Sequence, residues 1–308
     1  MTAPQDPERG MGVSPMHLQK SMGETPMPRK VACSVLLLTL NEEINLPRCL
    51  ASLTWCDDIV VLDSFSTDRT VEICKAAGCR VIQRKFDNWS SHQNWAVSNI
   101  PFKYPWVYYS DADEVMPPEL IQAVDAITSA PDRKAVAFGV RRKEMFWGRW
   151  LRHSSMYPIW ILRLFRPEKI RWERLVNPVA VVDGPTVRLQ RDIIHYSFSK
   201  GLHEWVEKHN KYAHFEAQEA MRVSKSGVDD FWGIFSVGDP LRRRKAMKAM
   251  SYRMPLRPLL RFIYMYFLKL GMLDGRPGLT YCRLIAMYEF FIDLNVKELR
   301  RREKSLPL

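Results

Sequence analysis

The sequence predicts an α/β fold, with a mostly parallel sheet followed by a mostly helical C-terminal appendage. Residues 31–39 form a near-continuous apolar run, which is typical of a strand buried on both faces of a sheet. Further strand-like runs follow it, separated by helix-like segments. We therefore expect a disordered leader over residues 1–30, a sheet domain over residues 31–200, and a basic and apolar helical region over residues 201–308.

Strands and helices alternate along the predicted sheet domain. A helix to about residue 53 follows the first strand, and a helix over residues 71–77 follows the second and ends at Gly78. This alternation implies parallel strands joined by right-handed crossovers, and ligands of such sheets bind beyond the carboxyl ends of the strands. The strands are predicted at residues 31–39, 58–63, 79–83 and 106–110.

Polar clusters follow three of these strands and should meet at that edge of the sheet. In the last cluster, Asp111 and Asp113 are two residues apart, a spacing that directs both carboxylates to one face of a strand. Converging carboxylates repel each other unless a cation lies between them. Mg²⁺ or Mn²⁺ fits, since either ion can be held by one or two carboxylates and a substrate diphosphate. The alternative is an acidic turn in which an Asp caps the helix that begins near Pro117.

The composition indicates an anionic partner. Lys and Arg total 46 against 34 acidic residues, which gives a formal net charge of +12. The basic clusters lie beside apolar segments and not in a stripe with exposed aromatic residues, so we expect anionic lipid and no nucleic acid as partner. The six cysteines form no Cys-x-x-Cys pair and are predicted to be reduced, buried residues of a cytoplasmic protein.

Three motifs occur in a specific order: TLNEE at residues 39–43, VLDSFSTDRT at residues 61–70 and DADE at residues 111–114. Together they resemble the family 2 glycosyltransferases of GT-A fold. Residues 146–150, 157–166 and 194–197 are similar to the acceptor side of the bacterial branch that includes lipopolysaccharide-core β-glucosyltransferases. The resemblance covers roughly residues 31 to 200, and it implies a sheet that binds a nucleotide sugar, with UDP preferred and GDP as the alternative.

The resemblance also implies roles for individual residues. Asp63 would meet the nucleotide base, and Gln93 would act by hydrogen bonding alone, because relatives frequently carry a Lys or Arg at this position. Asp111 would lie near the ribose and the metal, Asp113 would ligate the metal, and His195 would contribute to the metal or the diphosphate. A hydrogen-bonded core histidine is the alternative for His195. The residues expected to bind the nucleotide sugar are Thr39, Asn41, Glu43, Asp63, Ser66, Gln93, Asp111 and Ala112.

The general base is not marked by a family motif. Related members often carry a His-Glu pair after a Val, where this chain has Asn177 and Pro178 after Val176. We take Glu173 as the candidate base and Glu144 as the second candidate. A salt bridge with a neighbouring Arg is the alternative for Glu173.

These residue types suit an inverting, metal-dependent sugar transfer. The metal would stabilise the departing diphosphate, while an acceptor hydroxyl attacks an oxocarbenium-like carbon from the opposite face and a carboxylate takes its proton. The segment 145–150, which is rich in aromatic residues, is expected to form an acceptor wall or a buried edge of the second layer. Two alternatives stay open. A sugar nucleotidyltransferase would usually carry a Gly-rich phosphate loop, which residues 39–43 do not provide, and a basic nucleic-acid-binding protein would lack catalysis.

No stretch of the sequence reaches the ~18 uninterrupted apolar residues of a membrane span. Residues 259–270 come nearest, and with basic clusters at 242–245 and 300–302 they predict an interfacial helix; an ordinary core helix is the alternative. A turn over residues 274–278 should lead to a last helix over residues 279–302. We expect a glycolipid or saccharide acceptor and an enzyme bound peripherally to the anionic cytoplasmic face of the inner membrane.

Overall fold

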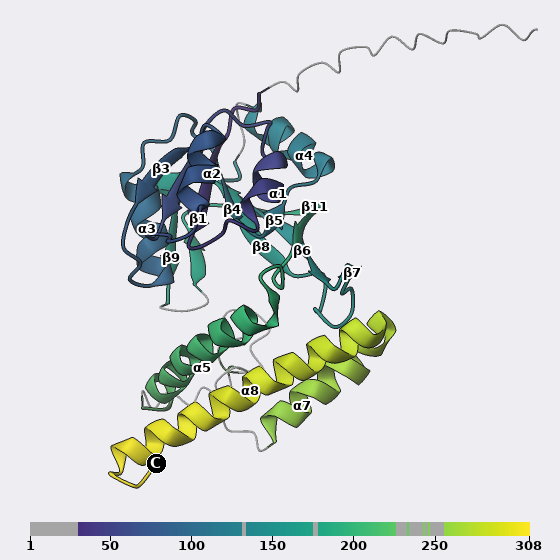
Figure 1. Cartoon of the computed structure of the whole chain (residues 1–308). Coiled ribbons are helices and arrows are strands. Elements are labelled where there is room, and N and C mark those ends of the chain that lie inside the picture. Colours follow the sequence, from purple (N-terminus) through teal and green to yellow (C-terminus); the bar gives the residue numbers. More distant parts are fainter. Residues whose placement is uncertain are drawn as a thin grey trace, which may run out of the picture.

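The computed structural model contains a β-sheet domain and a C-terminal helical body, which lies beneath the sheet domain in Figure 1. It describes residues 30–130, 134–174, 178–225, 233, 243, 246 and 256–308. The predicted leader up to residue 29, the positions Val176 and Asn177, and most of the basic cluster at 242–245 lie outside the described residues.

One mixed sheet of nine strands forms the centre of the first domain. Its order is β3-β2-β1-β4-β8-β6-β11-β5, with β7 paired to β6, and a separate hairpin joins β9 to β10. The pairs β3–β2, β2–β1 and β1–β4 are parallel, as predicted, whereas β8 is antiparallel to β4 and to β6. The strands are β1 (Ser34–Thr39), β2 (Ile59–Asp63), β3 (Arg80–Gln83), β4 (Val107–Asp111), β5 (Glu114–Val115), β6 (Ala137–Phe146), β7 (Arg149–Trp150), β8 (Trp160–Phe165), β9 (Ile170–Glu173), β10 (Val179–Val182) and β11 (Thr186–His195).

Alternate residues of β1 enter hydrophobic clusters on opposite faces of the sheet. Val35 and Leu37 pack with residues of α1 and α4, whereas Leu36 and Leu38 pack with Ala96 of α3. Because both faces are covered, every position of the strand must be apolar, which explains the continuous apolar run. The helices of this domain are α1 (Leu46–Ala51), α2 (Thr70–Ala76), α3 (Trp89–Asn99), α4 (Pro118–Thr128) and the single 3₁₀ turn η1 (Pro167–Lys169).

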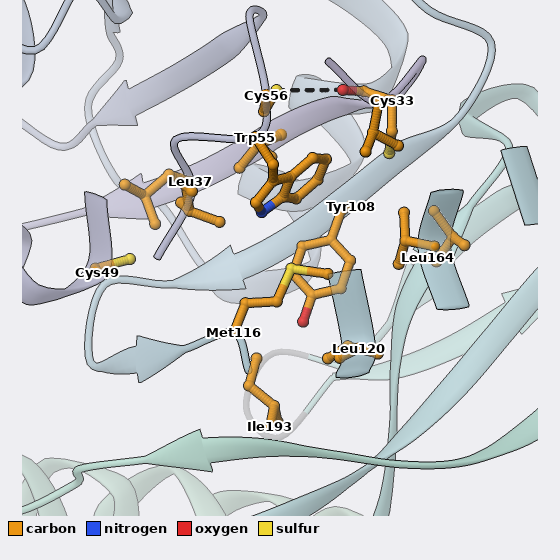
Figure 2. Packing of buried hydrophobic residues seen from close by; sticks show 14 of the residues in the cluster. Cys33, Leu37, Cys49, Trp55, Cys56, Tyr108, Met116, Leu120, Leu164 and Ile193 are labelled. Atoms are coloured by element: carbon orange, nitrogen blue, oxygen red, sulfur yellow. Dashed lines mark hydrogen bonds between the residues drawn. The ribbon is translucent and has the colours of Figure 1, made fainter. Parts of the chain in front are cut away.

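Figure 2 shows the centre of one cluster, where Trp55 packs edge-on against Tyr108 at a ring-centroid distance of 6.4 Å. In the same cluster, the thiol of Cys56 donates a hydrogen bond to the backbone carbonyl oxygen of Cys33 at 3.2 Å. All six cysteines are buried free thiols, in agreement with the prediction. Burial raises the pKa of Cys56 and of Cys74 to about 12, so these side chains behave as small apolar groups.

Helices α5 (Gly201–Lys225), α7 (Arg257–Ile263) and α8 (Gly275–Glu303) form the helical body. Small side chains on α5, which include Ala213 and Ala217, pack against Ile292 and Val296 of α8. A π-helical turn, η3 (Tyr264–Leu268), and a 3₁₀ turn, η4 (Gly271–Asp274), connect α7 to α8. Within the predicted interfacial helix at 259–270, the α-helical part therefore ends at Ile263.

The predicted turn at residues 274–278 is wrong, because α8 already begins at Gly275. Tertiary packing explains the early start. A Cβ atom at Gly278 would lie 2.5 Å from the carbonyl oxygen of Gly271, so only glycine allows this approach of η4 and α8. The carboxylate of Asp274 also accepts hydrogen bonds from the backbone N–H groups of His153 and Ser154 at 2.9 and 2.7 Å. These contacts attach the helical body to the loop that follows β7.

We expect Gly278→Ala to lower the thermal stability of the protein, because the added methyl group must displace the backbone of η4 or the side chain of Asp274. Such overpacking typically costs about 1–3 kcal/mol. Gly139→Ala in β6 is the matched control, since a Cβ atom there meets its neighbours at 3.5 Å or more. Calorimetric unfolding of both variants tests the expectation, which an unchanged melting temperature of Gly278→Ala would contradict.

Candidate active site

The loops that follow β1 and β2 are joined by hydrogen bonds. The backbone N–H of Asn41 donates to Ser66 Oγ at 2.9 Å, and Asn41 Oδ1 accepts from the N–H of Thr67 at 2.8 Å. Glu43 Oε2 accepts from the N–H of Arg69 at 3.1 Å. Asn41 has a φ of 54°, in the left-handed region that Asn tolerates better than most residues. Three of the residues predicted to bind the nucleotide sugar therefore hold the two loops together.

Asp63 is the buried centre of these loops. Its Oδ1 accepts from Thr39 Oγ1 at 3.0 Å and from the hydroxyl of Ser66. Its Oδ2 accepts from the N–H of Ser66 at 2.9 Å and from Gln83 Nε2 at 3.0 Å. Four donors already surround the carboxylate, so Asp63 fixes the position of the loop. Its contact with a nucleotide base stays a prediction.

Gln93 lies on α3 and is buried next to the hydroxyl group of Tyr109. Its Oε1 atom has no hydrogen-bond partner among the described residues. An unpaired buried amide oxygen costs about 1–3 kcal/mol, so this atom favours a donor from a bound molecule.

A buried arginine links the acidic residues at the end of β4. Arg163, on the neighbouring strand β8, donates through Nη2 to Asp111 Oδ2 and to Glu114 Oε1. Tyr109 Oη donates to Asp111 Oδ1 at 2.9 Å. The side chains of Arg163 and Glu114 are only 7% and 0% exposed, so the guanidinium compensates a carboxylate that water barely reaches, whereas Asp111 is 36% exposed. Burial alone would lower the pKa of Arg163, but Asp111 and Glu114 raise it well above its usual value.

The sequence does not single out Arg163 as a site residue. The available signal is a cation within the otherwise apolar strand-like residues 160–165, since a charged residue there needs a buried partner. The partner itself depends on the pairing of β4 with β8, which brings Tyr108 opposite Leu164.

His195 holds the second aspartate of the motif. Strand pairing places His195 opposite Glu144 of β6 and Glu114 of β5. Its Nε2 lies 3.3 Å from Asp113 Oδ2, and its Nδ1 lies 2.8 Å from Glu144 Oε2. Burial alone would lower the pKa of His195, but the charges of Asp113 and Glu144 raise it to about 10. The same imidazolium holds the pKa of Asp113 well below its usual value, against the effect of burial.

This geometry departs from the prediction that His195 is a metal ligand, because both of its ring nitrogens already face carboxylates. Within the described part of the chain, no three His, Cys, Asp or Glu side chains are grouped so that they could hold a metal ion. Asp113 still offers the hard oxygen donors that Mg²⁺ and Mn²⁺ prefer. The donor set thus fits a metal ion that enters with a substrate diphosphate, and it does not form a cage of protein ligands.

The alternative interpretation of the acidic motif as a helix cap is not observed. The residue that precedes α4 is Pro117, and no side chain caps the helix there. Ala112 and Asp113 instead form a tight turn between β4 and β5.

The two candidate bases lie in different surroundings. Glu144 is 3% exposed, and its carboxylate accepts from His195 and from the hydroxyl of Ser197, so its position suits it to orienting His195. Glu173 is exposed at the end of β9 and pairs with Arg171 at 3.2 Å, as the salt-bridge alternative expects. The preceding residue, Trp172, packs against the ring of Tyr109 at a centroid distance of 6.4 Å. The end of β9 is therefore close to the Asp111 site.

Helix α5 and Lys200, the residue before it, add cations to this edge of the sheet. Lys200 Nζ lies 2.6 Å from Glu42 Oε1 in the first loop and 3.8 Å from Glu204 Oε1. Lys208 follows one helical turn after Glu204, on the same face. Burial alone would lower the pKa of Lys208, but nearby groups, Tyr212 first and then Asp113, raise it above its usual value. No carboxylate of the described residues forms an ion pair with Lys208, so its ammonium group can meet an anion at the site.

Residues 34–192 match the family model described as glycosyl transferase family 2, and this stretch is just over half of the chain. The chain belongs to this family. Membership makes it a glycosyltransferase, and it confirms both the resemblance and the GT-A class of α/β fold with a helical C-terminal part. The two alternatives, a sugar nucleotidyltransferase and a nucleic-acid-binding protein without catalysis, are not supported.

Members with related sequences include a lipopolysaccharide core biosynthesis glycosyltransferase, LpsC of Rhizobium meliloti. It is 26% identical over 203 residues, which cover 64% of this chain and 74% of LpsC. An uncharacterized glycosyltransferase of Rickettsia typhi is 24% identical over 207 residues, covering 62% of this chain and 69% of the relative.

Matches among solved structures show lower identity. S. aureus TarS 1–349 is 15% identical with a TM-score of 0.41, covering 88% of this chain and 92% of the TarS chain. Glucosyl-3-phosphoglycerate synthase of Mycobacterium tuberculosis, in complex with Mn²⁺ and UDP, is 21% identical with a TM-score of 0.31 and covers 37% of this chain and 44% of that chain.

We expect Arg163→Met to lower the free energy of unfolding by about 3–5 kcal/mol, because Asp111 and Glu114 then lack their buried partner. Adding Glu114→Gln should recover part of this loss, since it removes one of the two uncompensated charges. Arg69→Met, which breaks an exposed ion pair with Glu72, should change little. Urea unfolding of the four proteins tests this order, and equal losses for Arg163→Met and Arg69→Met would contradict it.

We expect a pH dependence of stability from His92, whose Nδ1 lies 2.8 Å from Arg84 Nη1. Burial and the charge of Arg84 lower the pKa of His92 to about 4, whereas the unfolded chain should titrate near 6.5. As the pH falls, His92 therefore binds its proton first in the unfolded state. The free energy of unfolding then falls by about 3 kcal/mol between pH 6.5 and pH 4. His92→Gln should flatten the unfolding free energy over this range, whereas His203→Gln, at an exposed position, should leave the slope unchanged.

Proposed function

We propose that the protein transfers a sugar, with inversion, from a nucleotide-diphosphate sugar to a hydroxyl of a membrane-associated glycolipid or polysaccharide precursor. We further propose that UDP-sugars are the donors and that Mg²⁺ or Mn²⁺ is required. The observation that carries this proposal is the charge arrangement at the end of β4, where Asp113 is fixed by His195 and Lys208 stands near it on α5. A diphosphate bound there would meet the metal ion held by Asp113 on one side and the ammonium group of Lys208 on the other.

Each residue of this arrangement has a proposed task. Asp113 would hold the metal ion, which supplies Lewis-acid stabilisation of the departing diphosphate. Lys208 would add a preorganised positive charge to the same group. Tyr109 and Arg163 fix the carboxylate of Asp111, whose remaining lone pairs would accept a ribose hydroxyl.

We assign proton removal from the acceptor to Glu173. Its carboxylate is exposed at the end of β9, so an incoming hydroxyl can reach it after the contact with Arg171 opens. Glu144 is the weaker candidate, because it is buried and already bound to His195 and Ser197. Inversion follows from one displacement with the acceptor on the face opposite to the diphosphate.

A membrane-associated acceptor agrees with two findings. The relative LpsC is named for lipopolysaccharide core biosynthesis, which makes a glycolipid the acceptor class to test first. The described helices include none that is long and apolar enough to cross a bilayer. Exposed apolar side chains nevertheless gather between α7 and α8, and peripheral attachment to the cytoplasmic face of the inner membrane is therefore part of the proposal.

Donor binding gives the first test. Wild-type protein should bind one UDP-sugar in the presence of Mn²⁺ and lose it with a chelator, and Asp113→Asn should abolish this metal-dependent binding. Lys208→Ala should weaken UDP-sugar binding by about tenfold, because one charge-assisted contact is lost. Lys211→Ala is the matched control, because Lys211 lies on the same helix but pairs with Glu207 at 3.0 Å. Calorimetric titration measures all four, and equal binding by wild type and Asp113→Asn would refute the proposal.

A further inference from the structure

The end of the helical body next to β7 carries an exposed apolar surface, which we name the tip surface. Leu268 is 71% exposed and Trp147 is 67% exposed, although both side chains are large and apolar. Contiguous apolar surface of this kind is uncommon on soluble monomers unless it binds something. The tip surface consists of Trp147, Phe267, Leu268, Leu270, Met272 and Leu273.

The two segments of the tip surface are held side by side. Arg149 Nη2 donates to the carbonyl oxygen of Leu273 at 3.3 Å, which ties the turn that carries Trp147 to η4. The bonds of Asp274 to His153 and Ser154 secure the same junction. Figure 1 shows β7 beside the end of α8 that follows η4. Trp147 and the residues of η4 therefore belong to one surface.

Cations border the tip surface, and its two segments, residues 145–153 and 256–273, contain no acid. Of the three cations in residues 256–273, Arg257 and Arg261 pair with Glu289 of α8. Lys269 is exposed within this stretch, and Arg149, Arg152 and Arg276 are exposed around it. Asp274, the nearest acid in the sequence, is buried, and its Oδ2 accepts three hydrogen bonds. Apolar and tryptophan side chains with a basic border are typical of surfaces that enter the headgroup region of anionic bilayers.

We propose that the tip surface binds an anionic lipid bilayer, with Trp147 and Leu268 entering the interface and Lys269 contacting the headgroups. The inference rests on the proposed function, because it assigns the bilayer as the place where the acceptor is met. The same strand connects both sites: Glu144 of β6 holds His195, and Phe146 at its end packs on Phe198 with a ring distance of 4.2 Å. Docking would thus bring lipid-linked hydroxyls to the strand that supports the transfer site.

Vesicle flotation tests this surface. The full-length protein should bind phosphatidylcholine vesicles that contain phosphatidylglycerol, and binding should weaken in high salt. Leu268→Glu and Trp147→Ser should each reduce binding by tenfold or more. Leu308→Glu is the matched control, because Leu308 is 75% exposed and lies at the opposite end of α8, so this variant should bind as the wild type does.

Measuring UDP-sugar binding in solution separates a failure of the inference from a failure of the proposed function. If Leu268→Glu loses vesicle binding but keeps its melting temperature and its UDP-sugar binding, the inference is supported. A wild-type protein that binds a UDP-sugar but no anionic vesicle overturns the inference, together with the peripheral attachment, and leaves the proposed sugar transfer from a UDP-sugar intact. A wild-type protein that binds anionic vesicles but no UDP-sugar overturns the proposed function alone. A wild-type dimer that Leu268→Glu dissociates, without vesicle binding, would show that the tip surface pairs with a second copy, and it would also overturn the inference.

Discussion

The guanidinium of Arg163 lies between two carboxylates that would repel each other without it, and both come from the segment that turns out of β4. Asp111 and Glu114 fix the ends of the turn, and Asp113 between them is held by His195. The turn can therefore carry three acidic residues in four positions because two cations from other strands compensate them. Loss of the buried cation would leave Glu114, whose side chain is 0% exposed, without a partner or solvent to compensate its charge.

The strand order makes this compensation possible. Arg163 comes from β8, which lies between β4 and β6, and His195 comes from β11, which lies between β6 and β5. The strands beyond β4 thus supply the cations, whereas the parallel strands β1 and β2 supply the loops expected to bind the nucleotide. Each side chain is fixed by its place in a ladder, so the spacing of charges is set by backbone hydrogen bonds.

The parallel part of the fold is predictable from the sequence because its information is local. The apolar run of β1 shows burial on both faces, and the polar residues after each strand mark the edge where a ligand binds. His195 could be selected as a site residue, but its role depended on the strand register that places it opposite Glu144. Arg163, Lys208 and the start of α8 depend on contacts between distant segments, and no short motif records them.

The two loops that follow β1 and β2 are fixed by their own hydrogen bonds, which join Asn41 to Ser66 and Ser66 to Asp63. Fixing a flexible residue costs about 1–2 kcal/mol of conformational entropy, and these residues have lost that freedom during folding. Donor association should therefore spend little of its contact energy on ordering the loops. Substitutions that loosen Asn41 would then weaken affinity without removing a single contact to the nucleotide.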